Sequence, residues 1–197
     1  MRKIVFHIQM TLNNCIAKAD GTFWERFPWG DEETAFLTQQ FREADTWALG
    51  RKAYETIVPW WNAVAAGESP EGASAISAAD REFAAVQKSM TKVVFSASLD
   101  PRPDRVVIEG DVGAELGAMK RRHGKDILLT CGPATLAPIA STPGLIDEYL
   151  LSMSPAVVGA GPRVFEGVST DLSLDLVAAN VFSGGAVVLR YRAVPTR

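Results

Sequence analysis

In three short stretches of the sequence, an apolar run that would form a strand ends at a small residue. A helix or a turn would begin there. In the first, "ALGRKAYE" (48–55), Gly50 leaves the apolar run and is followed directly by Arg51 and Lys52. Backbone N–H groups at the start of a helix, beside an arginine, suit a phosphate. The same residues also fit an ordinary strand-to-helix turn with a solvated basic pair, and residue chemistry alone leaves both interpretations open.

The second stretch, "VVFSAS" (93–98), ends its apolar run at Ser96. A hydroxyl at this point suits a ribose or phosphate oxygen, and it equally suits the capping of a turn. In open α/β sheets, ligands bind beyond the carboxyl ends of the strands, which is where this serine would lie.

The third stretch, "LLTCGPATLAPI" (128–139), turns on a Gly-Pro step. Gly132 lets another group approach the backbone without a Cβ in the way, and Pro133 fits the first position of a helix. The amides of Ala134 and Thr135 would then be donors that face whatever lies beyond the strand. A proline that simply starts a helix is the alternative.

The segments around these stretches alternate between strand and helix patterns. Apolar runs rich in β-branched residues predict strands at 3–10, 46–50, 92–98, 105–109, 126–130, 146–158, 172–183 and 186–194. Gly184 and Gly185 suit a tight hairpin turn between the last two. The pattern predicts an α/β fold with one mostly parallel sheet, helices on both faces and an antiparallel C-terminal hairpin.

One helix pattern and the segment after it are interrupted. Pro59 lies within "RKAYETIVPWW" and is expected to bend or end that helix. The following segment, 62–75, is rich in Ala, Gly, Ser and Pro and is expected to be an exposed, flexible insertion. Strand and helix patterns resume in the same style afterwards, so we expect a single domain over residues 1–197.

Composition and charge exclude several functional classes. The net charge is −3 and there is no basic tract, so there is no electrostatic case for binding nucleic acid. The chain has two cysteines and two histidines, scattered along its length, and no metal site is expected. No secretory signal and no apolar run of roughly 20 residues is present, so we expect a cytoplasmic protein without membrane contact.

The G-x-G in "VVGAGPRVFEG" (157–167) is not a dinucleotide-binding fingerprint. The third glycine of G-x-G-x-x-G is missing, Pro162 lies inside the motif, and no helix pattern follows.

In this order, the motifs resemble the dihydrofolate reductase superfamily, and more closely its branch that contains the reductase domain of riboflavin biosynthesis. "LGRKAYETI" resembles the superfamily's G-R-x-T-Y/W-E-S, "VVFSASL" its V-F-S-x-T-L, and "MTLNNCIA" the branch's S-L-D-G-x-I-A. The block from "LLTCGPATL" to "RVFEG" resembles G-G-x-x-L … G-L-I-D-E-L … P-V-V-L-G-x-G … L-F. The likeness covers most of the chain apart from 62–75.

The resemblance implies a reductase that uses NADPH to reduce a small heterocyclic (pteridine- or pyrimidine-like) or carbonyl substrate. It also implies a homodimer. The cofactor contacts that it implies are Gly50, Arg51, Lys52, Ser96, Cys131, Gly132, Ala134 and Thr135. The first four match the positions that hold the adenosine phosphate end, and the others form the turn that holds the pyrophosphate.

The sequence departs from the family pattern at three places. Ala53 stands where the family usually has threonine, Cys131 replaces the first glycine of Gly-Gly, and Asn13 and Asn14 replace Asp-Gly. These departures support an alternative, a catalytically inactive reductase-like protein that binds a nucleotide or another small ligand. The zinc-deaminase pattern H-x-E … P-C-x-x-C is absent from the sequence, so a bifunctional riboflavin enzyme is not expected from this chain alone.

The resemblance also implies a proton donor. Folate-type reductases use an acid on the helix after the first loop, and Asp31 is its nearest equivalent here, although Glu32 has the better spacing to Phe36. The alternative is that Asp31, Glu32 and Glu33 simply complement the helix dipole.

Four further side chains are candidates for the pocket or for the core. Trp24, Phe27 and Trp29 lie near the first loop, where they would line a pocket for a flat ring or belong to the core. His7 lies within an apolar strand and is expected to be a satisfied buried histidine, not a catalyst.

Overall fold

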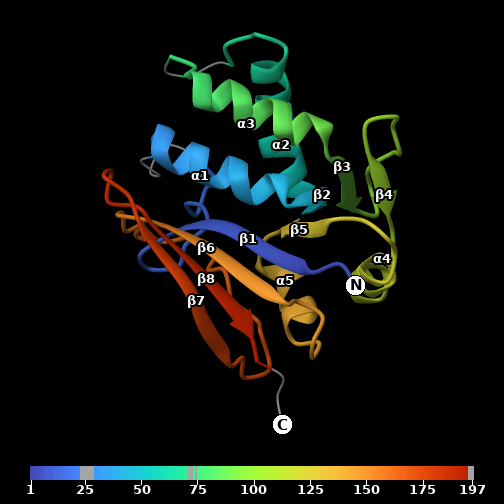
Figure 1. The fold of residues 1–197 in the computed structure, drawn as a ribbon. Helices are drawn as coiled ribbons and strands as arrows, with labels where there is room; N and C mark the ends of the chain where they lie inside the picture. Colours follow the sequence, from blue (N-terminus) through green and yellow to red (C-terminus); the bar gives the residue numbers. More distant parts are fainter. Residues whose placement is uncertain (23–28, 71–72, 74, 195–197) are drawn as a thin grey trace.

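The apolar runs assemble into one eight-stranded sheet in the computed structural model, which describes residues 1–22, 29–70, 73 and 75–194. The strands are β1 (Ile4–Thr11), β2 (Ala44–Gly50), β3 (Thr91–Phe95), β4 (Val106–Ile108), β5 (Asp126–Thr130), β6 (Glu148–Ser154), β7 (Leu174–Val181) and β8 (Val187–Ala193). Their order across the sheet is β4-β3-β2-β5-β1-β6-β8-β7 (Figure 1).

The direction of the strands changes only near the C-terminus. All neighbouring pairs from β4 to β6 are parallel, whereas β8 runs antiparallel to both β6 and β7. The last two strands form the predicted hairpin. Its turn includes Gly185 at a φ of +85°, in the left-handed region that glycine enters without strain.

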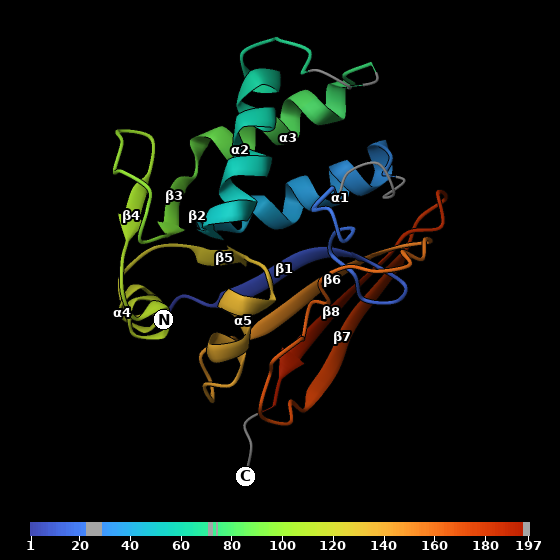
Figure 2. The ribbon, with the colours of Figure 1, turned by 180° about the vertical axis from the view of Figure 1, so that it is seen from behind.

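Helices cover both faces of the sheet (Figures 1 and 2). The helices α1 (Asp31–Arg42), α2 (Arg51–Ala65) and α3 (Ala78–Ser89) pack on one face, and α4 (Val112–Lys120) and α5 (Pro133–Ala140) pack on the other. Alternate side chains of β1 enter the two cores, with Val5 on the α1–α3 side and Ile4 and Phe6 on the α4–α5 side. Burial on both faces explains why the central strands, such as β1, are largely apolar, and the arrangement confirms the predicted fold class.

Helix α2 is longer than the sequence predicts. It does not end at Pro59 but continues to Ala65. Pro59 lies on the exposed side of the helix, while Val58 and Trp61 beside it are buried and hold the helix to the core. The first four residues of the segment 62–75 therefore belong to α2, and residues 71, 72 and 74 lie outside the described residues.

Strand β6 is shorter than the predicted strand 146–158. It ends at Ser154 because Pro155, which follows, has no N–H to donate to the sheet. Within the described part of the chain, no helix has the combination of length and apolar character that crossing a membrane requires.

Candidate active site

A cavity of about 770 Å³ opens where β2, β3 and β5 end, and it extends inward between the sheet and α1–α3. Its lining includes all eight residues predicted to contact a cofactor: Gly50, Arg51, Lys52, Ser96, Cys131, Gly132, Ala134 and Thr135. Strands β3, β2 and β5 are consecutive and parallel, so their carboxyl ends meet at one edge of the sheet. The structure thus brings the three sequence motifs together around one opening.

Two helices begin at this opening, and neither has a side-chain cap. The N-cap of α2 is Gly50 and that of α5 is Gly132, and a glycine has no side chain with which to accept a hydrogen bond from the first amides of its helix. Strands β2 and β5 are paired as far as Leu49 and Thr130, so the two helix starts are neighbours. Amides without an intrahelical acceptor and two positive dipole ends therefore converge at the mouth of the cavity, an arrangement that favours an anion such as a phosphate.

Arg51 and Lys52 add positive charge at the mouth. Both side chains are exposed, and Arg51 Nη1 lies 3.2 Å from Glu55 Oε2 one turn along α2. An exposed pair of this kind stabilises a helix by only about 0.3–0.5 kcal/mol. The guanidinium is therefore free to exchange this carboxylate for a phosphate.

Ser96 occupies the turn after β3 and also lines the cavity. Its Oγ accepts hydrogen bonds from the backbone N–H groups of Ser98 and Leu99, both at 3.1 Å. The hydroxyl therefore caps the turn, as one of the two sequence interpretations expected, and it does so at the wall of the cavity.

Cys131 fits beside the mouth because of the glycine opposite it. The cysteine is 1% exposed and packs in the core on the α4–α5 side, and burial raises the pKa of its thiol to about 12. A Cβ placed on Gly50 would lie 3.2 Å from the Cβ of Cys131. Gly50 thus supplies the space that Cys131 occupies, and the thiol stays protonated and unreactive at neutral pH.

Aromatic rings line the inner end of the cavity: Trp29, Phe41, Trp47, Trp61 and Phe83. Phe41 makes edge-to-face contacts with Trp47 and Phe83, with ring centroids 5.3 and 4.9 Å apart. Walls of this kind suit a flat ring. Trp29 both lines the cavity and packs against the core on the α1–α3 side, whereas Trp24 and Phe27 lie outside the described residues.

His7 lies beneath this aromatic wall and is 8% exposed. Its ring contacts Phe41 edge to face at 5.7 Å, and its Nε2 lies 3.4 Å from Ser152 Oγ. Burial lowers the pKa of the imidazole to about 4, so His7 is neutral at physiological pH. This environment is that of a buried histidine with polar contacts, as the sequence predicts.

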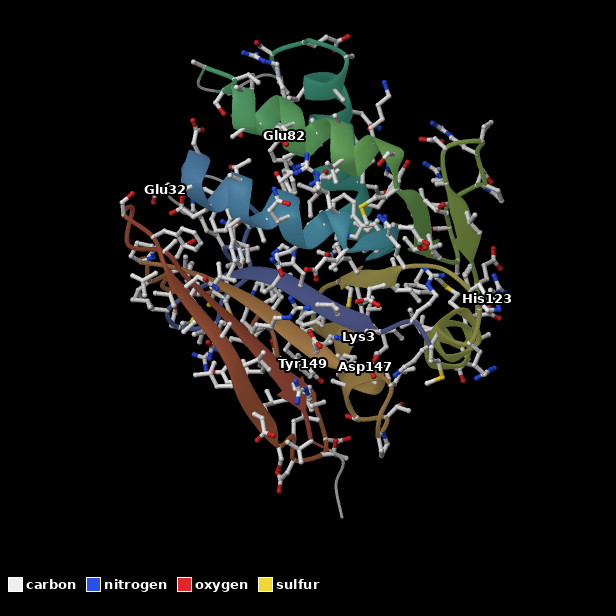
Figure 3. The ribbon with its side chains drawn as sticks, viewed as in Figure 1. Lys3, Glu32, Glu82, His123, Asp147 and Tyr149 are labelled. Atoms are coloured by element: carbon white, nitrogen blue, oxygen red, sulfur yellow. The ribbon has the colours of Figure 1, made fainter. Side chains whose placement is uncertain are left out.

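The acids at the start of α1 lie apart from the cavity lining. Asp31 is exposed at the first helical position. Glu32 lies beside the β7–β8 turn (Figure 3) and accepts hydrogen bonds from Ser183 N and Oγ at 3.1 and 2.8 Å, which lower the pKa of its carboxyl. Glu33 is buried and accepts the Gly30 N–H at 3.0 Å. The Glu33 contact is the one expected of an acid that supports the helix start, whereas Glu32 joins α1 to the β7–β8 turn.

Sequence reasoning missed three polar residues of the inner end: Gln9 of β1, Gln87 of α3 and Thr130 of β5. Thr130 Oγ1 accepts the indole N–H of Trp47 at 3.0 Å. A signal for Gln87 was present in the sequence, because it lies four residues after Phe83 and interrupts the buried face of α3 with an amide.

The residues that replace Asp-Gly have a structural role. Asn13 donates from Nδ2 to Val158 O at 2.7 Å and accepts from Val158 N at 3.2 Å. Asn14 has a φ of 63°, a conformation that asparagine adopts more readily than most residues.

Gly161 approaches Ala17 so closely that a Cβ would lie 1.9 Å from the Ala17 carbonyl oxygen. The G-x-G segment therefore serves the packing of two loops.

Comparison with known proteins gives matches over almost the whole chain. Residues 2–188 match the family model of the RibD C-terminal domain. The uncharacterized protein YyaP of Bacillus subtilis (strain 168) is 28% identical over 193 residues, which cover 96% of this chain and 94% of that protein.

Solved structures share the fold at low sequence identity. A putative riboflavin biosynthesis protein from Shewanella sp. PV-4 has a TM-score of 0.68 and 18% identity, covering 98% of this chain and 99% of that one. Dihydrofolate reductase from Enterococcus faecalis, complexed with NADP(H), has a TM-score of 0.60 and 14% identity, covering 97% and 96%.

Proposed function

The chain belongs to the RibD C-terminal domain family, and we propose on that basis that it is an NADPH-dependent reductase. The substrate that we propose is a small heterocycle, pteridine- or pyrimidine-like, or a small carbonyl compound. The family match supports the reductase class, and a protein of the same fold in complex with NADP(H) supports the cofactor.

The observation that carries the proposal is the contrast between the two ends of one cavity. The mouth combines two uncapped helix starts, at Gly50 and Gly132, with the cations of Arg51 and Lys52. The inner end is aromatic. The phosphates of a dinucleotide cofactor would suit the mouth, and the flat ring of a substrate beside the nicotinamide would suit the aromatic end.

The residues at the mouth fit the phosphates of NADPH. Gly50, Arg51, Lys52 and Ser96 would hold the adenosine phosphate end, and Cys131, Gly132, Ala134 and Thr135 would hold the pyrophosphate. The backbone donors there are pre-positioned by α2 and α5, so binding requires little rearrangement.

The chemistry that NADPH supplies is hydride transfer, and the chain's own residues would orient the reactants and exclude water. The buried rings of Phe41, Trp47 and Phe83 form a dry wall for this purpose. His7 is neutral, and Glu55, the one carboxylate among the described lining residues, pairs with Arg51. The accompanying proton would come from water, because Asp31, the donor that the family resemblance suggests, is exposed and lies outside the cavity lining.

Titration with NADPH tests the proposal directly. Trp29, Trp47 and Trp61 line the cavity, so energy transfer from tryptophan to the bound reduced nicotinamide reports occupancy. We expect saturable quenching of tryptophan emission, with a matching rise in nicotinamide fluorescence. A failure to saturate at millimolar NADPH would reject the reductase.

A second candidate, a catalytically inactive protein that binds a nucleotide, is favoured by one observation. No free acid lies at the inner end of the cavity among the described residues. Single-turnover mixing of NADPH-loaded protein with candidate heterocycles separates the two functions. Loss of the reduced-nicotinamide absorbance supports the reductase, whereas tight binding without oxidation across pteridines, pyrimidines and carbonyl compounds supports the inactive protein.

We also propose that the chain forms a homodimer. Strand β7 is at the edge of the sheet and exposes Leu176, Val177 and Val181, and exposed apolar side chains on an edge strand favour association. Light scattering on the purified chain tests this, and a monomeric mass at micromolar concentration would contradict it.

A further inference from the structure

Two glutamines that line the cavity hold buried amide atoms with no hydrogen-bond partner. Gln87 of α3 is 3% exposed and its Oε1 is unpartnered, and Gln9 of β1 has an unpartnered Nε2. In the described part of the chain, the other buried side-chain atoms in this condition are Glu33 Oε1 and Ser154 Oγ, and neither residue lines the cavity. Buried polar atoms without partners are unfavourable and rare in proteins, so the two amides require an explanation.

Helix α3 is held in place without the side chain of Gln87. Its first turn is capped by Ser77, whose Oγ accepts a backbone N–H at 3.1 Å. Its last carbonyl groups bind Lys92, whose Nζ donates to the backbone oxygens of Gln87 and Lys88. The Gln87 side chain lies instead on the buried face with Phe83, where an apolar residue of the same size would suit the fold better.

On β1, the polar neighbours of Gln9 are already engaged. His7, two residues earlier on the same face, lies with Nε2 3.4 Å from Ser152 Oγ. Thr11, two residues later, donates from Oγ1 to Asn13 Oδ1 at 2.7 Å. Gln9 is therefore the residue on this face whose donor remains available to a ligand.

We propose that Gln87 and Gln9 are specificity-determining residues of the cavity, where Gln87 Oε1 accepts an N–H and Gln9 Nε2 donates to a carbonyl oxygen of the bound ring. This inference rests on the proposed function for the identity of the cavity as a substrate site. A flat ring that carries both groups satisfies the two amides and stacks on the aromatic wall. A simple aldehyde or ketone leaves Gln87 unpaired, and a site built for hydrogen bonds discriminates strongly against such ligands. Of the two kinds of substrate proposed above, heterocycles therefore fit the cavity better than simple carbonyl compounds do.

The experiment uses the full chain and two ring probes in isothermal titration calorimetry. Lumazine is a flat ring with N–H and C=O groups, and 1,3-dimethyllumazine (dimethyllumazine below) keeps the carbonyl groups but has both N–H groups methylated. The variants are Gln87→Met and Gln9→Met, which keep side-chain length and remove the amide. The control is Gln39→Met, which makes the same change at an exposed position of α1.

We expect lumazine affinity to fall about tenfold or more in each cavity variant, as for the loss of one buried hydrogen bond, and to stay unchanged in the control. Dimethyllumazine should bind the unmodified chain more weakly than lumazine does, and Gln87→Met should not weaken it further. Unchanged lumazine affinity in Gln87→Met would overturn the inference, as would the absence of saturable lumazine binding to the unmodified chain.

Thermal unfolding distinguishes this role from a structural one. If the amide of Gln87 exists for a ligand, its removal should leave the Tm unchanged or raise it while lumazine affinity falls. A lower Tm with unchanged lumazine affinity would assign Gln87 to the fold. Titrations with and without NADPH separate the proposed role of the glutamines from the proposed reductase function. If the chain binds lumazine through both glutamines but does not bind NADPH, the result supports the role of Gln87 and Gln9 and refutes the reductase.

Discussion

The mouth and the inner end of the cavity are built in different ways. The mouth consists of three adjacent strand ends, and each contributes a motif of a few consecutive residues with backbone amides or exposed polar groups. The inner end consists of buried side chains from separate helices and strands, such as Phe41 of α1 and Phe83 of α3. The mouth therefore needs only the sheet and two helix starts, whereas the inner end exists only after α1–α3 have packed.

Mutations at the mouth and mutations at the inner end should therefore have different effects on stability and on ligand affinity. Charges at the mouth are exposed, so changing them should alter ligand affinity and leave stability almost unchanged. Rings at the inner end also form the core on the α1–α3 side of the sheet, so changing them should alter stability and binding together. The following four predictions test this division, from the largest expected effect to the smallest.

Truncation of Phe41 should have the largest effect. Phe41 is 1% exposed and contacts three rings, those of His7, Trp47 and Phe83. Phe41→Ala should lower the free energy of unfolding by about 3–5 kcal/mol, measured by urea denaturation. Phe36→Ala is the matched control on the same helix, because Phe36 is half-buried and lies outside the cavity lining. An equal loss of unfolding free energy in Phe36→Ala would contradict the prediction that the rings lining the cavity are also the rings that stabilise the core.

His7 should make the stability of the inner end depend on pH. Its pKa is about 4 in the folded chain against an ordinary value of 6.5, because burial disfavours the charged ring. Between these pH values the unfolded chain binds the proton and the folded chain does not, so stability falls as the pH is lowered from 6.5 towards 4. A shift of this size corresponds to a loss of about 3 kcal/mol.

Denaturation at a series of pH values measures this loss, and the two histidines provide a matched pair. His7→Gln should flatten the profile between pH 6.5 and 4. His123→Gln should leave it unchanged, because His123 is exposed in the turn after α4 (Figure 3), outside the buried core that encloses His7. An unaltered slope in His7→Gln would assign the pH dependence to other groups.

The sheet was predictable from the sequence because its signals are local. A strand buried on both faces, such as β1, is largely apolar, and the turn at Gly184 and Gly185 marks the hairpin. The end of α2 was not predictable in the same way. Pro59 is tolerated there because it lies on the exposed side, which depends on how the helix packs and not on its own sequence.

Removal of the charge of Arg51 should change affinity at the mouth without changing stability. If the guanidinium holds the 2′-phosphate, Arg51→Ala should weaken NADPH binding by about 10- to 100-fold, the range for a hydrogen bond to a charged group. NADH affinity should barely change, because NADH has no such phosphate. Arg81→Ala, at an exposed position of α3, is the control. Equal losses for the two cofactors would refute this role of Arg51.

The same distinction explains which cavity-lining residues could be predicted from the sequence. Gly50, Ser96 and Gly132 each end a strand within a recognisable motif, and all three line the cavity. Gln9 and Gln87 lie inside a strand and a helix, 78 positions apart in the chain, and no motif connects them. Their proximity to one cavity results from tertiary packing, which one sequence without a structure does not show.

The contact between Gly50 and Cys131 should have the smallest effect, and it is a place where the mouth depends on side-chain packing. Gly50→Ala brings a Cβ to 3.2 Å from the Cβ of Cys131, and overpacking of this kind costs at least about 1 kcal/mol of stability. NADPH affinity should fall as well, because relief of the contact displaces the start of α2. In a Cys131→Gly background the same substitution should cost less, since the opposing Cβ is gone. A double-mutant cycle by urea denaturation measures the difference, and a coupling below about 0.3 kcal/mol would mean that the mouth is independent of the core at this position too.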